Sequence, residues 1–394
     1  MLLNRKIPLV VLFLLLLQSC IEPFMPKTVK YDYSVFIEAL VTDEPGFLPE
    51  VRISTTVPLP NSKESEISEQ PEPINNAEVF LVCDDGSEYE FNQPDEFDQE
   101  SLYLLSDSSF ITETGKSYKL VIYLDGETLE SDFEKLAEPS PIDSLGYVVK
   151  TQKQTEDGTT EQGYQFLVSN HNDNPAPSYY RWIPDATFYF FVPYVSSFIW
   201  NGQELVPYSS ANEKACWKNK NINGIYVSTT EGLSQNSIIK APLHYESQYG
   251  DELTNIYSLH VKQLTISESC YNFWNEISKM IYESGGLFER QPFRVSGNIT
   301  CTSNPDFSVI GIFEVAGTSE YRAYFRTPRE FPVWWNNCHL TITNTQDNPL
   351  ENLPPGSFVK FDPETFEYTT SSEGCFDCTM KGGTTTKPPF WAPN

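Results

Sequence analysis

Histidine and basic side chains are scarce in this sequence of 394 residues. The four histidines, His171, His244, His260 and His339, never stand at the spacing of metal ligands. Lysine and arginine number 26 against 54 aspartates and glutamates, which gives a formal net charge of −28. A chain this acidic repels phosphate backbones, so the composition excludes nucleic acid as a partner. We expect no metal site.

The short motifs of common catalytic sites are also missing. The sequence contains no Gly-x-Ser-x-Gly elbow, no His-Glu-x-x-His helix, no P-loop and no Gly-x-Gly-x-x-Gly turn. Carboxylate pairs are plentiful among so many acids, so a glycosidase-type dyad stays open. No pair stands out from the others. We therefore expect no enzymatic activity, no catalytic residues and no cofactor.

Long hydrophobic runs are absent except for one short stretch near the N-terminus. Ile7–Leu17 gives eleven apolar or proline residues, whereas a helix that crosses a bilayer needs roughly 20. Two basic residues precede the run, and the letters "LQSC" that end at Cys20 resemble a bacterial lipobox. This pattern predicts a lipoprotein signal peptide over 1–19, with diacylglycerol and an N-acyl chain such as palmitate on Cys20. An ordinary cleaved signal and an uncleaved anchor are the alternatives.

The chain after Cys20 is rich in aromatic residues and in short apolar runs of period two, which indicate β-strands. Residues 20–32 are polar and contain proline, so we expect a tether. Asp85-Gly86 and Asp125-Gly126 each separate two alternating arms and predict hairpins with type I′ turns. Strands at this spacing indicate an Ig-like β-sandwich over 33–137.

A second, larger β-rich domain is expected over 138–394, after a proline-containing linker. One segment in it differs from the strands around it and predicts a packed amphipathic helix near 268–283. Ser267 or Ser269 can cap its N-terminus. The predicted fold class is therefore mainly β, with two β-sandwich-like domains. The apolar face of the helix comprises Cys270, Phe273, Trp274, Ile277, Met280 and Ile281.

Seven cysteines remain if Cys20 carries lipid, and an exported chain can oxidise them to disulfides. Because seven is odd, at least one is unpaired. Cys375 and Cys378 form a Cys-x-x-Cys element, which suits a redox pair, half of a zinc site or a structural disulfide. No apolar helical run follows and no second close pair exists, so we favour a structural disulfide that pins the C-terminal segment.

The stretch "TFYFFVPYVSSFIW" (187–200) concentrates aromatic residues. It is either one or two buried strands or a partly exposed surface that meets a membrane-protein partner. The candidate partner-binding aromatics are Tyr189, Phe190, Phe191, Tyr194 and Trp200.

Several landmarks together resemble one known family. These are the lipobox followed by "IEPF", the opening strand "VFIEALVTD", the "YYRW" of 179–182, "FERQPFRVSGNI" (288–299) and "CFDCTMKGGTTTKPPFW" (375–391). They are similar to Bacteroidota surface lipoproteins with domain of unknown function 4249. The resemblance implies lipidation of Cys20, a gene setting beside TonB-dependent receptors, and no catalytic residues.

These observations lead to one expectation of function and two alternatives. We expect an outer-membrane, lipid-anchored protein, facing the cell exterior, that docks on a TonB-dependent receptor or another barrel complex and assists substrate capture. A periplasm-facing orientation stays open. The alternatives are an accessory scaffold subunit of an outer-membrane assembly or secretion complex and, less favoured, a surface hydrolase.

Overall fold

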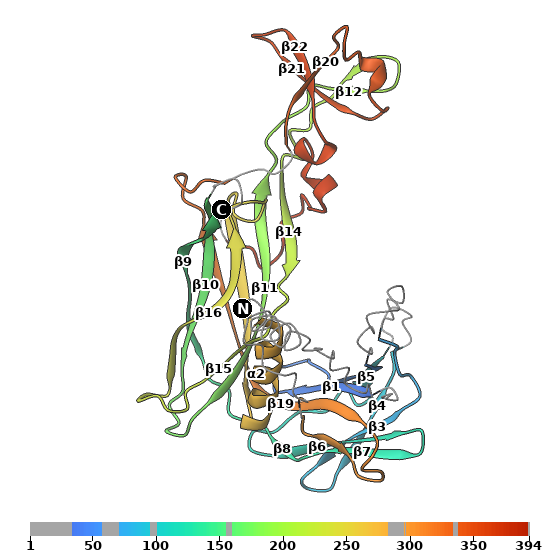
Figure 1. The fold of residues 1–394 in the computed structure, drawn as a ribbon, viewed down its shortest axis with the longest axis vertical. Helices are drawn as coiled ribbons and strands as arrows, with labels where there is room; N and C mark the ends of the chain where they lie inside the picture. Colours follow the sequence, from blue (N-terminus) through green and yellow to red (C-terminus); the bar gives the residue numbers. More distant parts are fainter. Residues whose placement is uncertain are drawn as a thin grey trace, which may run out of the picture.

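The computed structural model describes residues 34–56, 71–94, 101–154, 160–282, 295, 297–333 and 338–392. The predicted signal peptide and tether, with Cys20, lie outside the described residues. The described chain is mainly β, as expected, and forms three lobes that follow one another along the long axis of the molecule (Figure 1). We refer to them as the N-terminal, central and distal lobes.

The N-terminal lobe is one strongly curled sheet around a hydrophobic core. Its strands alternate buried and mostly half-buried positions, so that one face of each strand fills the core. The strands run in the spatial order β19-β1-β2-β5-β4-β3-β6-β7-β18, and β8 pairs with β6. Their bounds are β1 Val35–Thr42, β2 Glu50–Thr55, β3 Glu78–Cys83, β4 Glu88–Asn92, β5 Leu102–Leu105, β6 Ser117–Leu124, β7 Glu127–Ser131, β8 Glu134–Lys135, β18 Ile299–Cys301 and β19 Val309–Arg326.

Both predicted hairpins are confirmed, but the type I′ turn predicted at Asp85-Gly86 is wrong, because Gly86 has positive φ, at 84°, and Asp85 does not. β3 pairs antiparallel with β4 across Asp85-Gly86, and β6 pairs antiparallel with β7 across Asp125-Gly126. Asp125 and Gly126 both have positive φ, at 51° and 87°, as the two central residues of a type I′ turn require.

The Ig-like sandwich predicted for 33–137 is not confirmed, because two strands from far along the chain complete the lobe. β19 pairs with β1 in parallel, and β18 pairs with β7. β18 also lies beside β19. Next to β18, the Asn298 side chain donates to the Phe313 carbonyl of β19 and accepts from the Phe313 amide, both at 2.8 Å. The sheet therefore curls back onto itself, and the expected domain boundary at residue 137 does not divide the sheets.

The central lobe is a sandwich of two sheets. One sheet contains β14, β11, β17 and the second half of β19, with β15 also on β11, and the other has the order β16-β10-β9. Aromatic rings pack between the two sheets. The ring centres of Phe166 and Tyr257 are 4.9 Å apart, and those of Tyr147 and Phe325 are 5.5 Å apart. The bounds are β9 Ile142–Gln154, β10 Thr160–His171, β11 Tyr179–Phe191, β14 Ala215–Asn221, β15 Tyr226–Thr229, β16 Ser237–Ser247 and β17 Ile256–Ile266.

The predicted helix is confirmed as α2, Glu268–Tyr282. Ser267 caps it, because its hydroxyl accepts from the Cys270 amide at 3.3 Å. Cys270, Phe273 and Trp274 are buried against the sheet where the N-terminal and central lobes join. The later part of the predicted face is not covered by described residues, since Ile281 is 57% exposed.

The distal lobe is a five-stranded antiparallel sheet that projects from one end of the molecule (Figure 1). It follows the order β13-β12-β21-β22-β20, with a small core of its own. The bounds are β12 Phe198–Trp200, β13 Leu205–Pro207, β20 Thr341–Thr343, β21 Phe358–Asp362 and β22 Glu367–Thr370, with 3-10 helices η1 Leu350–Asn352, η2 Glu373–Cys375 and η3 Cys378–Lys381.

Candidate functional site

A cavity of about 520 Å³ opens where β14 and β16, the edge strands of the two central-lobe sheets, approach each other. His244 and Glu246 reach it from β16, because residues two apart in a strand share a face. Lys220 reaches it from the end of β14, and Tyr226 and Tyr282 add aromatic rings to the wall. This volume lies within the range of small-molecule pockets.

A chain of hydrogen bonds runs from this cavity into the core. His244 Nε2 lies 2.8 Å from the Tyr257 hydroxyl, and that hydroxyl donates to Glu246 Oε2 at 3.3 Å. Lys220 Nζ donates to Glu246 Oε1 at 2.7 Å and to Glu252 Oε1 at 2.9 Å. Because the Tyr257 hydroxyl donates its hydrogen to Glu246, it accepts the hydrogen bond from His244. His244 therefore carries its proton on Nε2. Its Nδ1 has no hydrogen-bond partner among the described residues.

Burial sets the protonation of these groups. It lowers the pKa of His244 to about 3, with the nearby Lys220 charge as a smaller cause, so the imidazole is neutral at physiological pH. Burial also raises the pKa of the Glu246 carboxyl, while its contact with Lys220 opposes the shift. The residues that line the cavity include no serine, threonine or cysteine. The arrangement can therefore bind a polar molecule.

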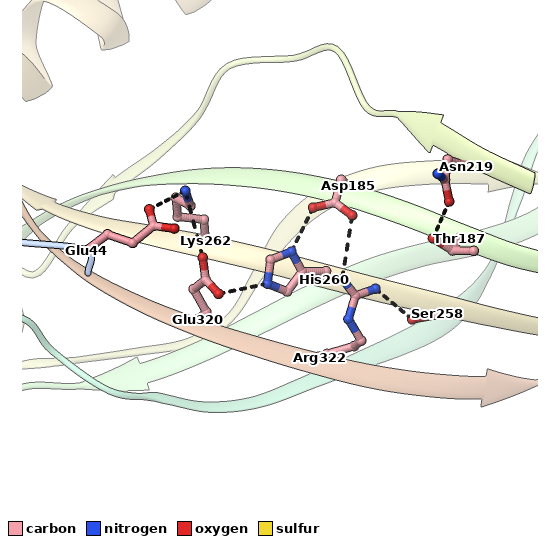
Figure 2. Close-up of polar contacts among 9 residues, drawn as sticks. All are labelled: Glu44, Asp185, Thr187, Asn219, Ser258, His260, Lys262, Glu320 and Arg322. Carbon is pink, nitrogen blue, oxygen red and sulfur yellow. Dashed lines mark hydrogen bonds and ion pairs between the residues drawn. The ribbon is translucent and has the colours of Figure 1, made fainter. Parts of the chain in front are cut away.

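A second polar cluster lies on cross-strand neighbours of β11, β17 and β19 (Figure 2). The His260 ring stands between Asp185, 2.7 Å from Nδ1, and Glu320, 3.3 Å from Nε2. Lys262 lies 3.8 Å from Glu320, and Arg322 lies 3.9 Å from Asp185. Both imidazole nitrogens are thus already paired, and opposite charges alternate across the three strands. These contacts account for the cluster as cross-strand pairing that stabilises the sheet.

No group of three or more His, Cys, Asp or Glu side chains in the described ranges is arranged to hold a metal ion. No helix in those ranges is long and apolar enough to cross a membrane. The predicted lipidation site, Cys20, lies outside the described residues.

The five candidate partner-binding aromatics do not form one exposed surface. Phe190 and Trp200 are buried, at 0% and 4% exposure, so contact of their rings with a partner is excluded in this fold. Tyr189 is half-buried 4.6 Å from the Trp217 ring. Tyr194 is half-buried and donates to the Cys338 carbonyl, and Phe191 is half-buried beside Tyr189. Within the stretch, residues 187–191 belong to β11 and residues 198–200 form β12, and its side chains are either buried or half-buried.

Cys375 and Cys378 are both in disulfides, but not with each other. Cys375 bonds to Cys338 and Cys378 bonds to Cys216. The expected bond between neighbours is therefore wrong, because the two side chains face different cores. Cys375 lies in the core of the distal lobe and Cys378 in that of the central lobe.

Three other cysteines are free among the described residues, in line with the odd count. Cys83 and Cys270 are buried, and Cys301 is half-buried. With Cys375 and Cys378 oxidised, neither thiolate is available to a zinc ion in this structure.

Comparison with known proteins gives little beyond a family. The comparison with curated proteins finds no match. One solved structure, a DUF4785 family protein from Legionella pneumophila, has 11% sequence identity and a TM-score of 0.16. The alignment covers 58% of the chain described above and 52% of the Legionella protein. The chain therefore spans about half the length of the Legionella protein. The model of the Domain of unknown function (DUF4249) matches residues 21–322, and the chain therefore belongs to the DUF4249 family.

Proposed function

We propose that the protein is an outer-membrane lipoprotein, anchored through lipid on Cys20, that docks on a TonB-dependent barrel and assists substrate capture. The observation that best supports export is the pair of disulfides, Cys216–Cys378 and Cys338–Cys375. Disulfides persist in oxidising compartments and are rare in the cytosol. Their presence supports a location outside the cytoplasm, where the short apolar run and Cys20 would place an acyl anchor.

The distal lobe supports docking. It projects away from the other two lobes (Figure 1). Several of its apolar side chains are exposed. Phe366 is 77% exposed, Ile342 is 46% exposed and Val206 is 40% exposed. Val206 and Ile342 lie on the two edge strands, β13 and β20, and Phe366 lies in the turn between β21 and β22. Exposed apolar side chains of this kind can contact a protein partner. We propose that the distal lobe contacts the loops of the barrel partner.

Detergent extracts of outer membranes test the docking. The full-length chain should retrieve a large TonB-dependent barrel, and the Phe366→Ser variant should lose it. Ile111→Ser is the matched control, because Ile111 is 81% exposed on the N-terminal lobe. Recovery of assembly or secretion components in place of a receptor would favour the scaffold function instead.

Fractionation tests the anchor. The Cys20→Ala variant should leave the membrane and appear in the soluble fraction, because the acyl chains supply the membrane affinity. A Cys20→Ala protein that still pellets with washed membranes would contradict lipid anchoring. Protease treatment of intact cells then reports the orientation: digestion of the distal lobe indicates surface exposure, and full protection indicates the periplasmic face.

A further inference from the structure

A buried ion pair lies beneath helix α2, away from the cavity at His244. Arg181 on β11 places a terminal guanidinium nitrogen, Nη2, 2.7 Å from Glu314 Oε2 on β19. The Glu314 side chain is 0% exposed and that of Arg181 is 13% exposed. The guanidinium carbon also lies 4.4 Å from the centre of the Trp274 ring, a cation–π arrangement. The Arg181 charge is thus held firmly in place from two sides.

This pair is not fully satisfied by the residues around it. Arg181 Nε donates to no acceptor among the described residues. Buried polar atoms almost always find hydrogen-bond partners, and an exception calls for a specific reason such as an absent ligand. Arg181 and Trp274 also line a cavity, so a ligand there would meet the held guanidinium directly.

The cavity has a volume of about 300 Å³, at the small end of ligand pockets. Arg52, Glu38 and Glu50 line it from β1 and β2. None of these three side chains forms an ion pair with another described residue. Two guanidinium groups and two carboxylates therefore line one small cavity, and Glu38 lies directly opposite Arg52 on the neighbouring strand.

The charges on the cavity wall point to a ligand that carries both signs. Two arginines can receive a carboxylate, for which the guanidinium fork has matching geometry. Glu38 and Glu50 can receive an ammonium group. Leu40, Ile183, Pro184 and Ile225 supply an apolar wall beside the charged groups. A simple anion would leave the two glutamates unpaired and repelled, and a simple cation would do the same to the arginines.

We propose that this cavity binds a free α-amino acid with an apolar side chain. The α-carboxylate bonds to Arg181 and Arg52, the α-ammonium bonds to Glu38 or Glu50, and the side chain contacts the apolar wall. This function is separate from membrane anchoring and from docking on a barrel, because every residue involved lies in the N-terminal and central lobes. It can therefore hold or fail independently of both.

Calorimetry on the full chain in detergent tests the proposal with L-leucine as the probe. Leucine should bind. Two analogues each lack one charge: 4-methylpentanoate has no ammonium and L-leucinamide has no carboxylate. Each should bind at least about tenfold more weakly, because each loses a charge-assisted contact. Absence of leucine binding at about 10 mM, or equal affinity for leucine and 4-methylpentanoate, would overturn the proposal.

Variants place the site. Arg52→Gln should weaken leucine binding by about tenfold or more. Arg52 is exposed and has no ion pair in the described chain, so the fold should tolerate the change. Arg329→Gln is the matched control, since it removes an exposed arginine elsewhere. Glu38→Gln is a second variant that tests the ammonium contact. Leucine affinity unchanged in both Arg52→Gln and Glu38→Gln would refute binding in this cavity.

Discussion

Acidification should destabilise the central lobe through His244. The side chain is 7% exposed, and its ring stacks 4.7 Å from that of Phe166. Burial lowers its pKa to about 3 in the folded state, whereas an unfolded histidine has a pKa of about 6.5. Between these two values the unfolded chain binds a proton that the folded chain does not. The contribution of His244 to the free energy of unfolding is therefore fully present above about pH 6.5 and is lost progressively as the pH falls toward 3.

The size of the effect follows from linkage. Each pH unit inside this window removes about 1.4 kcal/mol from the free energy of unfolding. Integrated from pH 7.5 to pH 5, the loss through His244 is about 2 kcal/mol. Glu246 acts with the opposite sign, because its raised pKa stabilises the fold at low pH and this contribution disappears as the pH rises through the folded-state pKa. The histidine contribution must therefore be measured as a difference between variants.

Urea unfolding at pH 7.5, 6.25 and 5 measures that difference. His244→Gln keeps a side-chain N–H that can reach Tyr257 and removes the titrating imidazole. The wild-type chain should lose about 2 kcal/mol more than this variant between pH 7.5 and pH 5. His339→Gln, at an exposed histidine, should retain the wild-type dependence. An identical pH dependence in wild type and His244→Gln would refute the assignment of a buried, neutral His244.

Three further predictions concern stability. Reduction of the Cys216–Cys378 disulfide, or its removal by Cys216→Ala, should cost about 2–5 kcal/mol, which non-reducing and reducing thermal melts compare. Glu314→Gln should cost about 3–5 kcal/mol in urea unfolding, because it leaves the Arg181 charge buried without its counter-charge; a loss below about 1 kcal/mol would show that water reaches the pair. Gly297→Ala should prevent folding or cost more than about 4 kcal/mol, since a Cβ there would lie 1.5 Å from the Gly311 carbonyl oxygen; a native circular dichroism spectrum with unchanged melting would contradict this contact.

The features that the sequence predicted correctly are those encoded by local signals. Asp125-Gly126 specifies its own turn through two residues with positive φ. The helix at 268–282 follows from apolar spacing and a serine cap within a few residues of one another. Strand alternation likewise needs only neighbouring positions. These signals give the fold class and several hairpins without knowledge of the rest of the chain.

The features that the sequence did not reveal depend on pairings between distant segments. Cys378 bonds to a cysteine 162 residues earlier rather than to its neighbour three residues away, and spacing alone does not specify such a bond. For the cavity at His244, the sequence indicates only that His244 and Glu246 share one face of a strand. Lys220 joins them from another sheet, a contact that requires the packing of the two layers.

The parallel pairing of β1 with β19 constrains the order in which the protein can fold as it is synthesised. The first strand of the N-terminal lobe meets its partner at a separation of 274 residues, as the contact between Ser34 and Ser308 illustrates. A chain that is synthesised from its N-terminus must keep β1 without its parallel neighbour until β19 has been made. Closing so long a connection is entropically costly and slow. The edge of β1 that pairs with β19 stays open throughout this interval, so the growing chain is prone to aggregation for longer than a chain of consecutive hairpins would be.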